Sequence, residues 1–300
     1  MMRTFLLSVF ISCFMINTVL GWWETGHMLV AQIAKQDLLE NHPNIYKRAE
    51  EISLFVKGLT DNLSDTFIES AVWMDDIKND LFDSLFEWHF IDRPYNPLGL
   101  STPPLDKYNS IYAVEEAINV LNNTKTAGLT TLTKSVYLRI LLHVIGDMHQ
   151  PLHDACLYNL TYPDGDMGGN LETVFVEALN QSVVLHAFWD AVAFRVPNNL
   201  ARPLDAYNTS ILELLAKNFT QEFPRSALAD KLSNKNVTEW TVDGLLDAIE
   251  HVYNPLRPDF VIDQAYQQQA YDFLRRNIAL GGYRLADILV EVLRQEVPSA

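Results

Sequence analysis

The sequence is poor in cysteine, and this limits how the protein can be stabilised. Only two cysteines occur in 300 residues, and Cys13 lies in an apolar segment near the start of the chain. If that segment is removed, Cys156 has no partner, which excludes an internal disulfide. Stability must then come from core packing and from any bound metal.

Basic side chains are also scarce. The chain has 22 lysines and arginines against 38 aspartates and glutamates, which gives a formal net charge of −16. A protein that coats nucleic acid regardless of sequence needs a basic surface, so the composition argues against that class. An enzyme whose positive charge is bound metal remains compatible with this balance.

Beyond its first residues the chain has no long apolar run. Residues 1–21 carry one charge, Arg3, and an apolar stretch that ends in Val19-Leu20-Gly21. This pattern predicts a signal peptide over residues 1–21, cleaved after Gly21, and a mature domain over residues 22–300. No later segment is long and apolar enough to be a membrane anchor. We therefore expect a secreted protein, or a periplasmic one in a bacterium.

Glycosylation sites are plentiful if the host is eukaryotic. Seven Asn-x-Ser/Thr sequons follow the predicted signal peptide, and such sites accept glycans on exported proteins. They are Asn62, Asn122, Asn159, Asn180, Asn208, Asn218 and Asn236.

Alternating strand patterns, internal repeats and domain linkers are absent as well. Apolar residues recur at helical spacing instead. The segments with this spacing are 27–39, 110–121, 132–148, 211–219, 242–252 and 284–293, whereas 172–178 is the one candidate strand. Loops rich in Pro, Gly and Asn are expected over residues 93–107 and 159–170. The sequence predicts an all-α fold: a single mainly helical domain with long functional loops.

What the chain does have is polar residues embedded in apolar segments. His143 and Asp147 are four residues apart, so they project from one face of a helix, and His186 and Asp190 repeat this spacing. His153 follows in the bend after Pro151. One such pair often forms only a hydrogen bond, but an unpaired buried carboxylate is costly, and bound zinc removes that cost. Two pairs and a further histidine therefore favour a site with several metal ions.

Two further residues join the candidate metal ligands, and three histidines do not. Asp75 and His89 lie among large apolar residues and join the candidates. The remaining histidines have more polar neighbours, and we expect no metal there; they are His42, His149 and His251.

Several segments, in order, resemble one known family. They are WWETGH at 22–27, VWMDDIK at 72–78, WHFID at 88–92, LLHVIGDMHQPLHD at 141–154, GGN at 168–170, LHAFWD at 185–190 and GGYRLADIL at 281–289. The set resembles the zinc-dependent single-strand-specific nucleases, which include mung-bean nuclease and fungal extracellular nucleases. The resemblance implies the helical fold of the phospholipase C and single-strand nuclease superfamily, with long loops around a cleft that holds three zinc ions.

The resemblance also implies the ligands of each zinc ion. One ion would be held by Asp75, His89, His143 and Asp147. A second would be held by His27, by Asp147 as a bridge, and by the amino nitrogen and carbonyl oxygen of Trp22. A third would be held by His153, His186 and Asp190. Metal binding through Trp22 requires a free, deprotonated α-amine, which only cleavage after Gly21 creates.

The activity implied is hydrolysis of single-stranded DNA and RNA to 5′-phosphate products, with 3′-nucleotidase activity on 3′-nucleotides. Asp75 would orient the nucleophile and Lys78 would offset phosphate charge, although Lys78 could equally be an ordinary surface residue. Phe90 would stack on an unpaired base, unless it only packs in the core. Asp92 would contact the base edge, and Asn170 would shape the cleft. We expect a monomer.

Two other functions fit part of the pattern. A zinc-dependent phospholipase C is similar in fold and metal set, but the phospholipases look to use glutamate as the last ligand where this chain has Asp190. Phe90 and Asp92 also resemble the nuclease base pocket instead of a choline site. A secreted zinc-binding protein without activity would need the ligands alone, and Lys78, Phe90 and Asp92 would then have no role. Turnover of a phosphodiester separates these alternatives.

Overall fold

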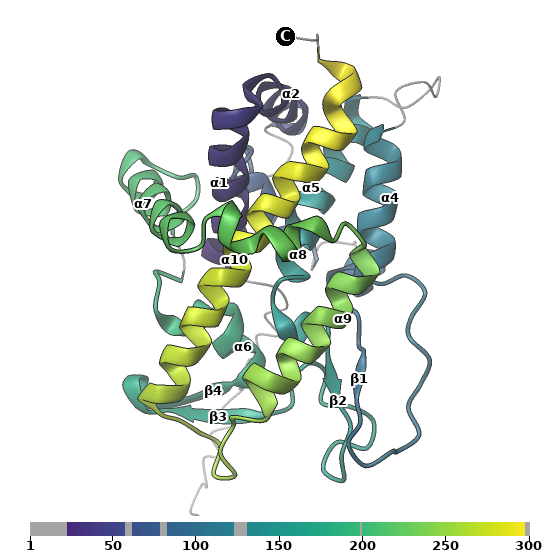
Figure 1. The fold of residues 1–300 in the computed structure, drawn as a ribbon, viewed down its shortest axis with the longest axis vertical. Coiled ribbons are helices and arrows are strands. Elements are labelled where there is room, and N and C mark those ends of the chain that lie inside the picture. Colours follow the sequence, from purple (N-terminus) through teal and green to yellow (C-terminus); the bar gives the residue numbers. More distant parts are fainter. Residues whose placement is uncertain (1–22, 58–61, 79–82, 123–130, 199, 298–300) are drawn as a thin grey trace, which may run out of the picture.

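A single long helix, α10 (Gln264–Leu293), runs through the length of the molecule (Figure 1). The computed structural model describes residues 23–57, 62–78, 83–122, 131–198 and 200–297. Within these ranges the other helices are α1 (Glu24–Asn41), α2 (Pro43–Ser53), α3 (Trp73–Ile77), α4 (Ser110–Asn122), α5 (Thr131–Asp147), α6 (Leu185–Asp190), α7 (Ala206–Glu222), α8 (Ala229–Ser233) and α9 (Val237–Asp247). The predicted mainly helical fold is confirmed.

The core forms where α1, α5 and α10 pack together. Every residue of α5 from Leu138 to Asp147 is buried, although His143 and Asp147 are among them. A helix that is buried on all sides lies inside a bundle instead of on its surface. The polar residues of α5 are therefore held in the interior, where they need partners.

Helix starts follow ordinary capping chemistry. The side chain of Asp205 accepts a hydrogen bond from the backbone of α7, Asn236 accepts two at the start of α9, and Asp263 accepts one at the start of α10. Such caps satisfy N–H groups that have no partner within the helix.

The helical segments predicted from spacing are present, with different ends. The prediction at 284–293 covers only the last part of α10, whose earlier turns are more polar. The segment 242–252 spans the end of α9 and a π-helix over Ala248–Tyr253. The sequence analysis did not identify α2, α3 or α8, of which α3 and α8 have only five residues, and it indicated α6 only through the spacing of His186 and Asp190.

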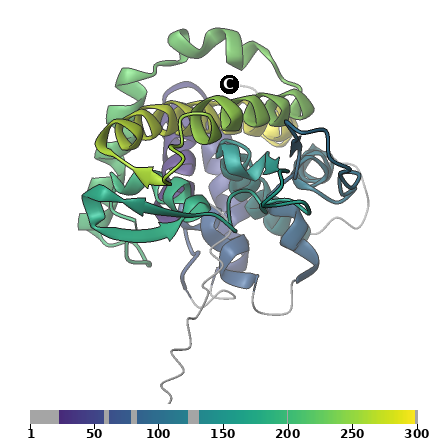
Figure 2. The ribbon, with the colours of Figure 1, turned by 90° about the horizontal axis from the view of Figure 1, so that it is seen from below.

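The expected strand at 172–178 forms β3 (Thr173–Val176). It pairs antiparallel with β4 (Gln181–Val184) and parallel with β5 (Val261–Ile262). A second small sheet joins β1 (Pro94–Tyr95) to β2 (Cys156–Leu157) in parallel. Seen from below, the β3–β4 hairpin lies to one side under the C-terminal helices (Figure 2). These strands lie a few residues from the short helices that carry His89, His153 and His186.

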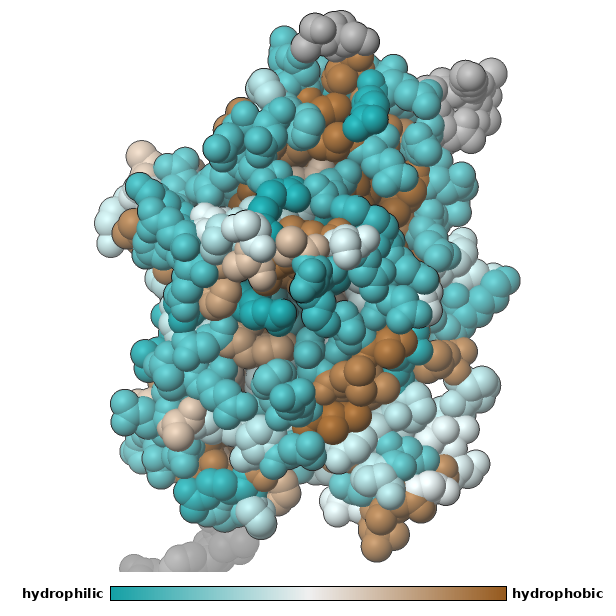
Figure 3. All heavy atoms as spheres, in the orientation of Figure 1, coloured by the Kyte–Doolittle hydropathy of each residue, from teal (hydrophilic) through white to brown (hydrophobic). Residues whose placement is uncertain are grey.

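The surface is largely hydrophilic in the view of Figure 3, as the acidic composition predicts. Among the described residues, none of the helices is long and apolar enough to cross a membrane. The predicted signal peptide at 1–21, and Trp22, lie outside the described residues. Cys156 is a free, buried thiol. All seven sequon asparagines are at least partly exposed, so glycosylation stays a prediction that the structure permits.

The packing of α10 on α1 generates a stability prediction about two adjacent glycines. A Cβ added at Gly282 would lie 2.5 Å from Ile33 Cγ2 and 3.0 Å from the carbonyl oxygen of Val30. We expect Gly282→Ala to lower the free energy of unfolding by about 1–3 kcal/mol, the usual cost of overpacking a core. Urea unfolding measures this loss.

Gly281→Ala is the matched control. A Cβ there meets only the His149 ring, at 3.1 Å. Both substitutions remove a helical glycine, so both gain a similar helix propensity of up to about 1 kcal/mol. The loss should be clearly smaller for Gly281→Ala, and equal losses would contradict the close approach of α1 and α10.

Candidate metal centre

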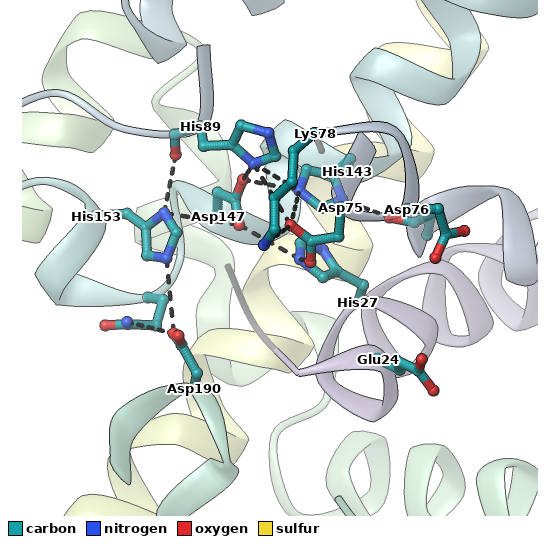
Figure 4. A network of polar contacts seen from close by, with 12 residues as sticks. Glu24, His27, Asp75, Asp76, Lys78, His89, His143, Asp147, His153 and Asp190 are labelled. Carbon is teal, nitrogen blue, oxygen red and sulfur yellow. Dashed lines mark hydrogen bonds and ion pairs between the residues drawn. The ribbon is translucent and has the colours of Figure 1, made fainter. Parts of the chain in front are cut away.

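The carboxylate of Asp147 is the centre of the site. It is completely buried, and its Oδ2 lies 3.1 Å from His143 Nε2 and 3.2 Å from His89 Nδ1. Its Oδ1 lies 3.4 Å from His27 Nε2 and 3.7 Å from His153 Nδ1. Figure 4 shows these side chains converging on Asp147 from separate segments. One carboxylate thus contacts residues predicted for all three metal ions.

Asp75 joins this cluster from α3. Its oxygens lie 3.8 Å from His27 Nε2, 3.9 Å from His89 Nδ1 and 3.8 Å from His143 Nε2. Lys78 donates a hydrogen bond of 3.1 Å to Asp75 Oδ1. Lys78 is therefore not an isolated surface lysine, because its ammonium group lies at the edge of the cluster (Figure 4).

The third predicted group forms around Asp190. His186 Nε2 lies 3.3 Å from Asp190 Oδ2, and His153 Nε2 lies 3.6 Å from Asp190 Oδ1. All three residues are buried. Because His186 and Asp190 share one turn of α6, the spacing of four residues places both on the same side, as predicted.

Backbone carbonyl groups orient three of the histidine rings. His143 Nδ1 donates to the carbonyl of Ala71, His153 Nδ1 to that of His89, and His186 Nδ1 to that of Gly168, at 2.7–2.8 Å. These bonds leave Nε2 of each ring pointing to the carboxylates, with a lone pair available when the ring is neutral. Hydrogen bonds of this kind are typical behind metal-ligating histidines.

Several buried polar atoms in the cluster lack a hydrogen bond. Those that face the carboxylate cluster include His27 Nε2, Asp147 Oδ1 and Asp190 Oδ2. Leaving such atoms unsatisfied is costly, and a cation bound between them would remove the cost. Three groups have ligand atoms close enough to hold a metal ion: His27–Asp75–His143, His89–His143–Asp147 and His153–His186–Asp190. The residues present therefore fit metal binding.

The pKa values divide the histidines into two kinds. Burial lowers the pKa of His27 well below its usual value, and it also lowers the pKa of His89 and His186, so these rings are neutral as ligands must be. Burial acts in the same direction on His153, but the charges of Asp147 and Asp190 outweigh it and raise its pKa to about 10. Without a cation, a proton on His153 neutralises part of the carboxylate charge.

A pocket lies directly beside the third group. Phe90, Asp92 and Asn170 line it together with His153 and His186. Phe90 is half-buried, with its ring edge-to-face against Phe86 at 5.5 Å, so it borders the pocket and is not enclosed in the core. The structure brings together the three residues predicted to contact substrate.

The start of the described chain approaches the same place. The backbone N–H of Trp23 donates to the carbonyl of Asp190, at 3.2 Å. The Trp23 ring packs edge-to-face on Phe194, in agreement with an ordinary packing role. Trp22 itself lies outside the described residues, so its role as a ligand stays a prediction.

Sequence reasoning missed two residues that support the site. Gln150 donates a 2.7 Å hydrogen bond to Asp190 Oδ1 and fixes that carboxylate. Arg202 bonds both carboxylate oxygens of Asp76, at 2.7 and 2.8 Å, and reaches Glu24 at 3.0 Å. It thereby ties the first turn of α1 to the residue next to Asp75. Gln150 could have been noticed between two candidate ligands, but Arg202 carries no local signal.

Hydrogen bonds within the protein engage both ring nitrogens of His149, one of the three histidines for which no metal role is predicted. His149 is buried, yet its Nδ1 donates to the Ile145 carbonyl and its Nε2 accepts from Arg284. Burial and the Arg284 charge lower the pKa of His149 to about 3. This ring lies against Trp240 and belongs to none of the three groups of possible metal ligands.

Several known proteins are similar to this chain over most of its length. A family model described as S1/P1 Nuclease matches residues 22–294. Nuclease P1 of Penicillium citrinum is 23% identical over 92% of the chain and 99% of its own length. Nuclease S1 of Aspergillus oryzae is 25% identical over 89% of the chain and 90% of its own length. Endonuclease 4 of Arabidopsis thaliana is 24% identical, over 92% and 90%.

The pKa of His153 generates a prediction about metal binding. A metal ion must displace the proton that His153 holds below about pH 10, so binding should release at least about one proton per chain near pH 7.5. Isothermal titration calorimetry of the metal-free protein, run in two buffers with different ionisation enthalpies, measures the number released. Affinity should also rise with pH. An observed heat that does not depend on the buffer would contradict this picture of the third group.

Proposed function

The chain belongs to the S1/P1 nuclease family, and on that premise we propose that it is a secreted, zinc-dependent endonuclease specific for single-stranded DNA and RNA. It would leave 5′-phosphate products and would also remove phosphate from 3′-nucleotides. The observation that carries the proposal is the clustering of three groups of possible metal ligands around Asp147 and Asp190, beside a pocket that includes Phe90.

Zinc is the metal that the donor atoms favour. Neutral imidazole and carboxylate are its usual ligands in proteins. The three groups of side chains support three ions, with the Trp22 amine completing the ligands of His27. Zinc bound there would lower the pKa of a water molecule to the neutral range and act as a Lewis acid on the phosphodiester.

The protein's own residues account for binding and orientation. Lys78 lies beside Asp75 and can offset the charge that develops on phosphate, while Asp75 orients the attacking water. A nucleoside stacked on Phe90 lies beside His153 and His186, because these residues line the same pocket. Its 3′ oxygen is then the leaving group at the third site, which leaves the phosphate on the 5′ side of the next nucleotide.

Single-strand preference follows from the same pocket. A base can stack on Phe90 only after it leaves its pairing partner and its neighbours. In a duplex this costs a few kcal/mol per base, whereas an unpaired strand has no pairing to lose. A 3′-nucleotide fills the same pocket with one nucleoside and places its phosphate at the metal ions.

Secretion supplies a step that the metal site needs. Cleavage after Gly21 would create the free amine of Trp22, so we propose that export and metal loading are coupled. A chain that kept residues 1–21 would have an amide at that position, which is a poor metal ligand at neutral pH.

The zinc content and the substrate range test the proposal together. The mature protein should hold three zinc ions per chain after dialysis, as measured by elemental analysis, and should hydrolyse single-stranded DNA and RNA. His186→Ala should retain about two ions and lose nearly all turnover, because it removes one of three protein ligands of the third ion.

The control variant is His42→Ala, because His42 is exposed and outside the cluster. It should keep three ions and full activity. Phosphatidylcholine should not be cleaved by any of these proteins. Turnover of that lipid without turnover of nucleic acid would instead support the phospholipase C alternative, and zinc without any turnover would favour a structural role.

Asp92 generates a prediction about base preference. Partial loss of hydration around its carboxyl, together with the charges of Glu87 and Asp166, raises the pKa of Asp92 to about 6, although Asp92 is an exposed residue. Above that pH the carboxylate can accept two hydrogen bonds from the N1–H and N2–H groups of guanine. Below it, the protonated group can instead donate to N3 of cytosine. The ratio of kcat/KM for 3′-GMP to that for 3′-CMP should fall about ten-fold or more from pH 7 to pH 5.

Asp92→Asn is the matched variant, since an amide does not titrate in this range. Its ratio should be constant with pH and below that of the original protein at pH 7. The two nucleotides should compete in one reaction, because the ratio of their rates then does not depend on how much of the enzyme holds its metal ions at each pH. A ratio that does not change with pH in the original protein would exclude this role for Asp92.

A further inference from the structure

A hollow of about 470 Å³ lies next to the base pocket and has no role in the activity described above. Its volume falls within the range of small-molecule binding sites. Four aromatic side chains and two carboxylates are among the residues that line it: Tyr95, Tyr162, Tyr253, Phe260, Asp166 and Glu172. None of the candidate metal ligands lines it.

The hollow and the base pocket are adjacent through two short segments. Asp166 lines the hollow, whereas Met167, Gly168 and Asn170 line the base pocket. In the second segment, Leu185 lines the hollow and His186 lines the base pocket. The molecule is hollowed at its lower edge in Figure 3, between the region of the β3–β4 hairpin and the loops near β1 and β2. A bound strand could therefore continue from one pocket into the other.

The aromatic rings are held in place by their hydroxyl groups. Tyr253 donates a 2.8 Å hydrogen bond to Asp166, and Tyr162 donates one of 2.8 Å to Glu172. The rings of Tyr95 and Tyr253 contact each other, with centroids 5.6 Å apart. With their hydroxyl groups engaged, these side chains can contact a ligand mainly through their rings.

The charge of the lining indicates which part of a nucleotide would bind. Arg257 is the cation of the lining, and it pairs with Asp259 at 2.7 Å. Asp166 is fully buried, and its two oxygens accept hydrogen bonds from the Leu157 N–H and the Tyr253 hydroxyl. The partly exposed Glu172 is therefore the carboxylate of the lining that can reach a ligand, and its negative charge disfavours a phosphate group. Glu172 suits a planar group that carries N–H donors, as the exocyclic amines of nucleobases do. Aromatic rings add stacking, which accepts any base.

We propose that the hollow binds the base of the nucleoside on the 5′ side of the one held at Phe90. A nucleoside at Phe90 has two neighbours in the strand, and its 3′ neighbour is attached through the phosphate at the metal ions. Because the hollow contains no metal ligand, its occupant would be the 5′ neighbour. This subsite rests on the proposed nuclease function and extends it, since it makes the enzyme sensitive to a second base.

A trinucleotide tests the subsite by competition within one molecule. Cleavage after the second nucleoside fills both pockets, whereas cleavage after the first leaves the hollow empty. The bond after the second nucleoside should be cut about ten-fold faster, as chromatography of the first products would show. A trinucleotide with an abasic first residue should lose this acceleration.

Variants assign the effect to the hollow. Tyr162→Ala should bring the ratio of the two cleavage rates close to one, whereas Tyr162→Phe should keep it high because the ring remains. Tyr95→Ala should reduce it independently. The matched control is Tyr207→Ala, on the exposed side of α7, which should leave the ratio unchanged.

The outcomes separate the two proposals. Absence of cleavage in any dinucleotide or trinucleotide would overturn the proposed function itself. Cleavage with a ratio near one in the original protein, or a ratio that Tyr162→Ala and the abasic residue do not change, would overturn the subsite alone. Because the ratio compares two bonds in one substrate, partial unfolding or metal loss in a variant does not alter it.

Discussion

The structure depends on keeping the charged carboxylate of Asp147 in a fully buried position. Four histidines from different segments face it within 3.1–3.7 Å. Burial alone would raise the pKa of Asp147, but His143, His153 and His27 hold it well below its usual range. An isolated buried charge costs several kcal/mol, so the fold is acceptable only when these partners, and the cations that fit between them, are in place.

This requirement explains the irregular parts of the fold. The carbonyls of Ala71, His89 and Gly168 each hold one histidine ring, and each belongs to a bend or short helix next to the bundle. The small sheets hold these segments where the rings need them. Since Cys156 has no disulfide partner among the described residues, metal ions would also act as the cross-links between α1, α5 and α6.

The distribution of charge over the protein would also govern how a substrate binds. The protein is strongly acidic, and its positive charge would be concentrated as metal at one cleft. Phosphate would be bound there and at Lys78. Away from the cleft, the lining of the base pocket and of the hollow beyond it is aromatic or negative, so bases would be bound there by stacking and by hydrogen bonds to their N–H groups.

The sequence by itself indicated the candidate metal ligands and most of the longer helices, except for α2 and the first part of α10. The spacing of His143 and Asp147, and of His186 and Asp190, fixes which side chains share a helical face, because that depends only on local geometry. Only the resemblance to the nuclease family predicted which of these pairs Asp75, His89 and His153 would join, because local spacing does not show how separate segments come together. The roles of Gln150 and Arg202, the two-residue strands and the hollow behind Asp166 were decided by tertiary structure alone. They arise where segments distant in the chain meet, and no periodicity in the sequence records such contacts.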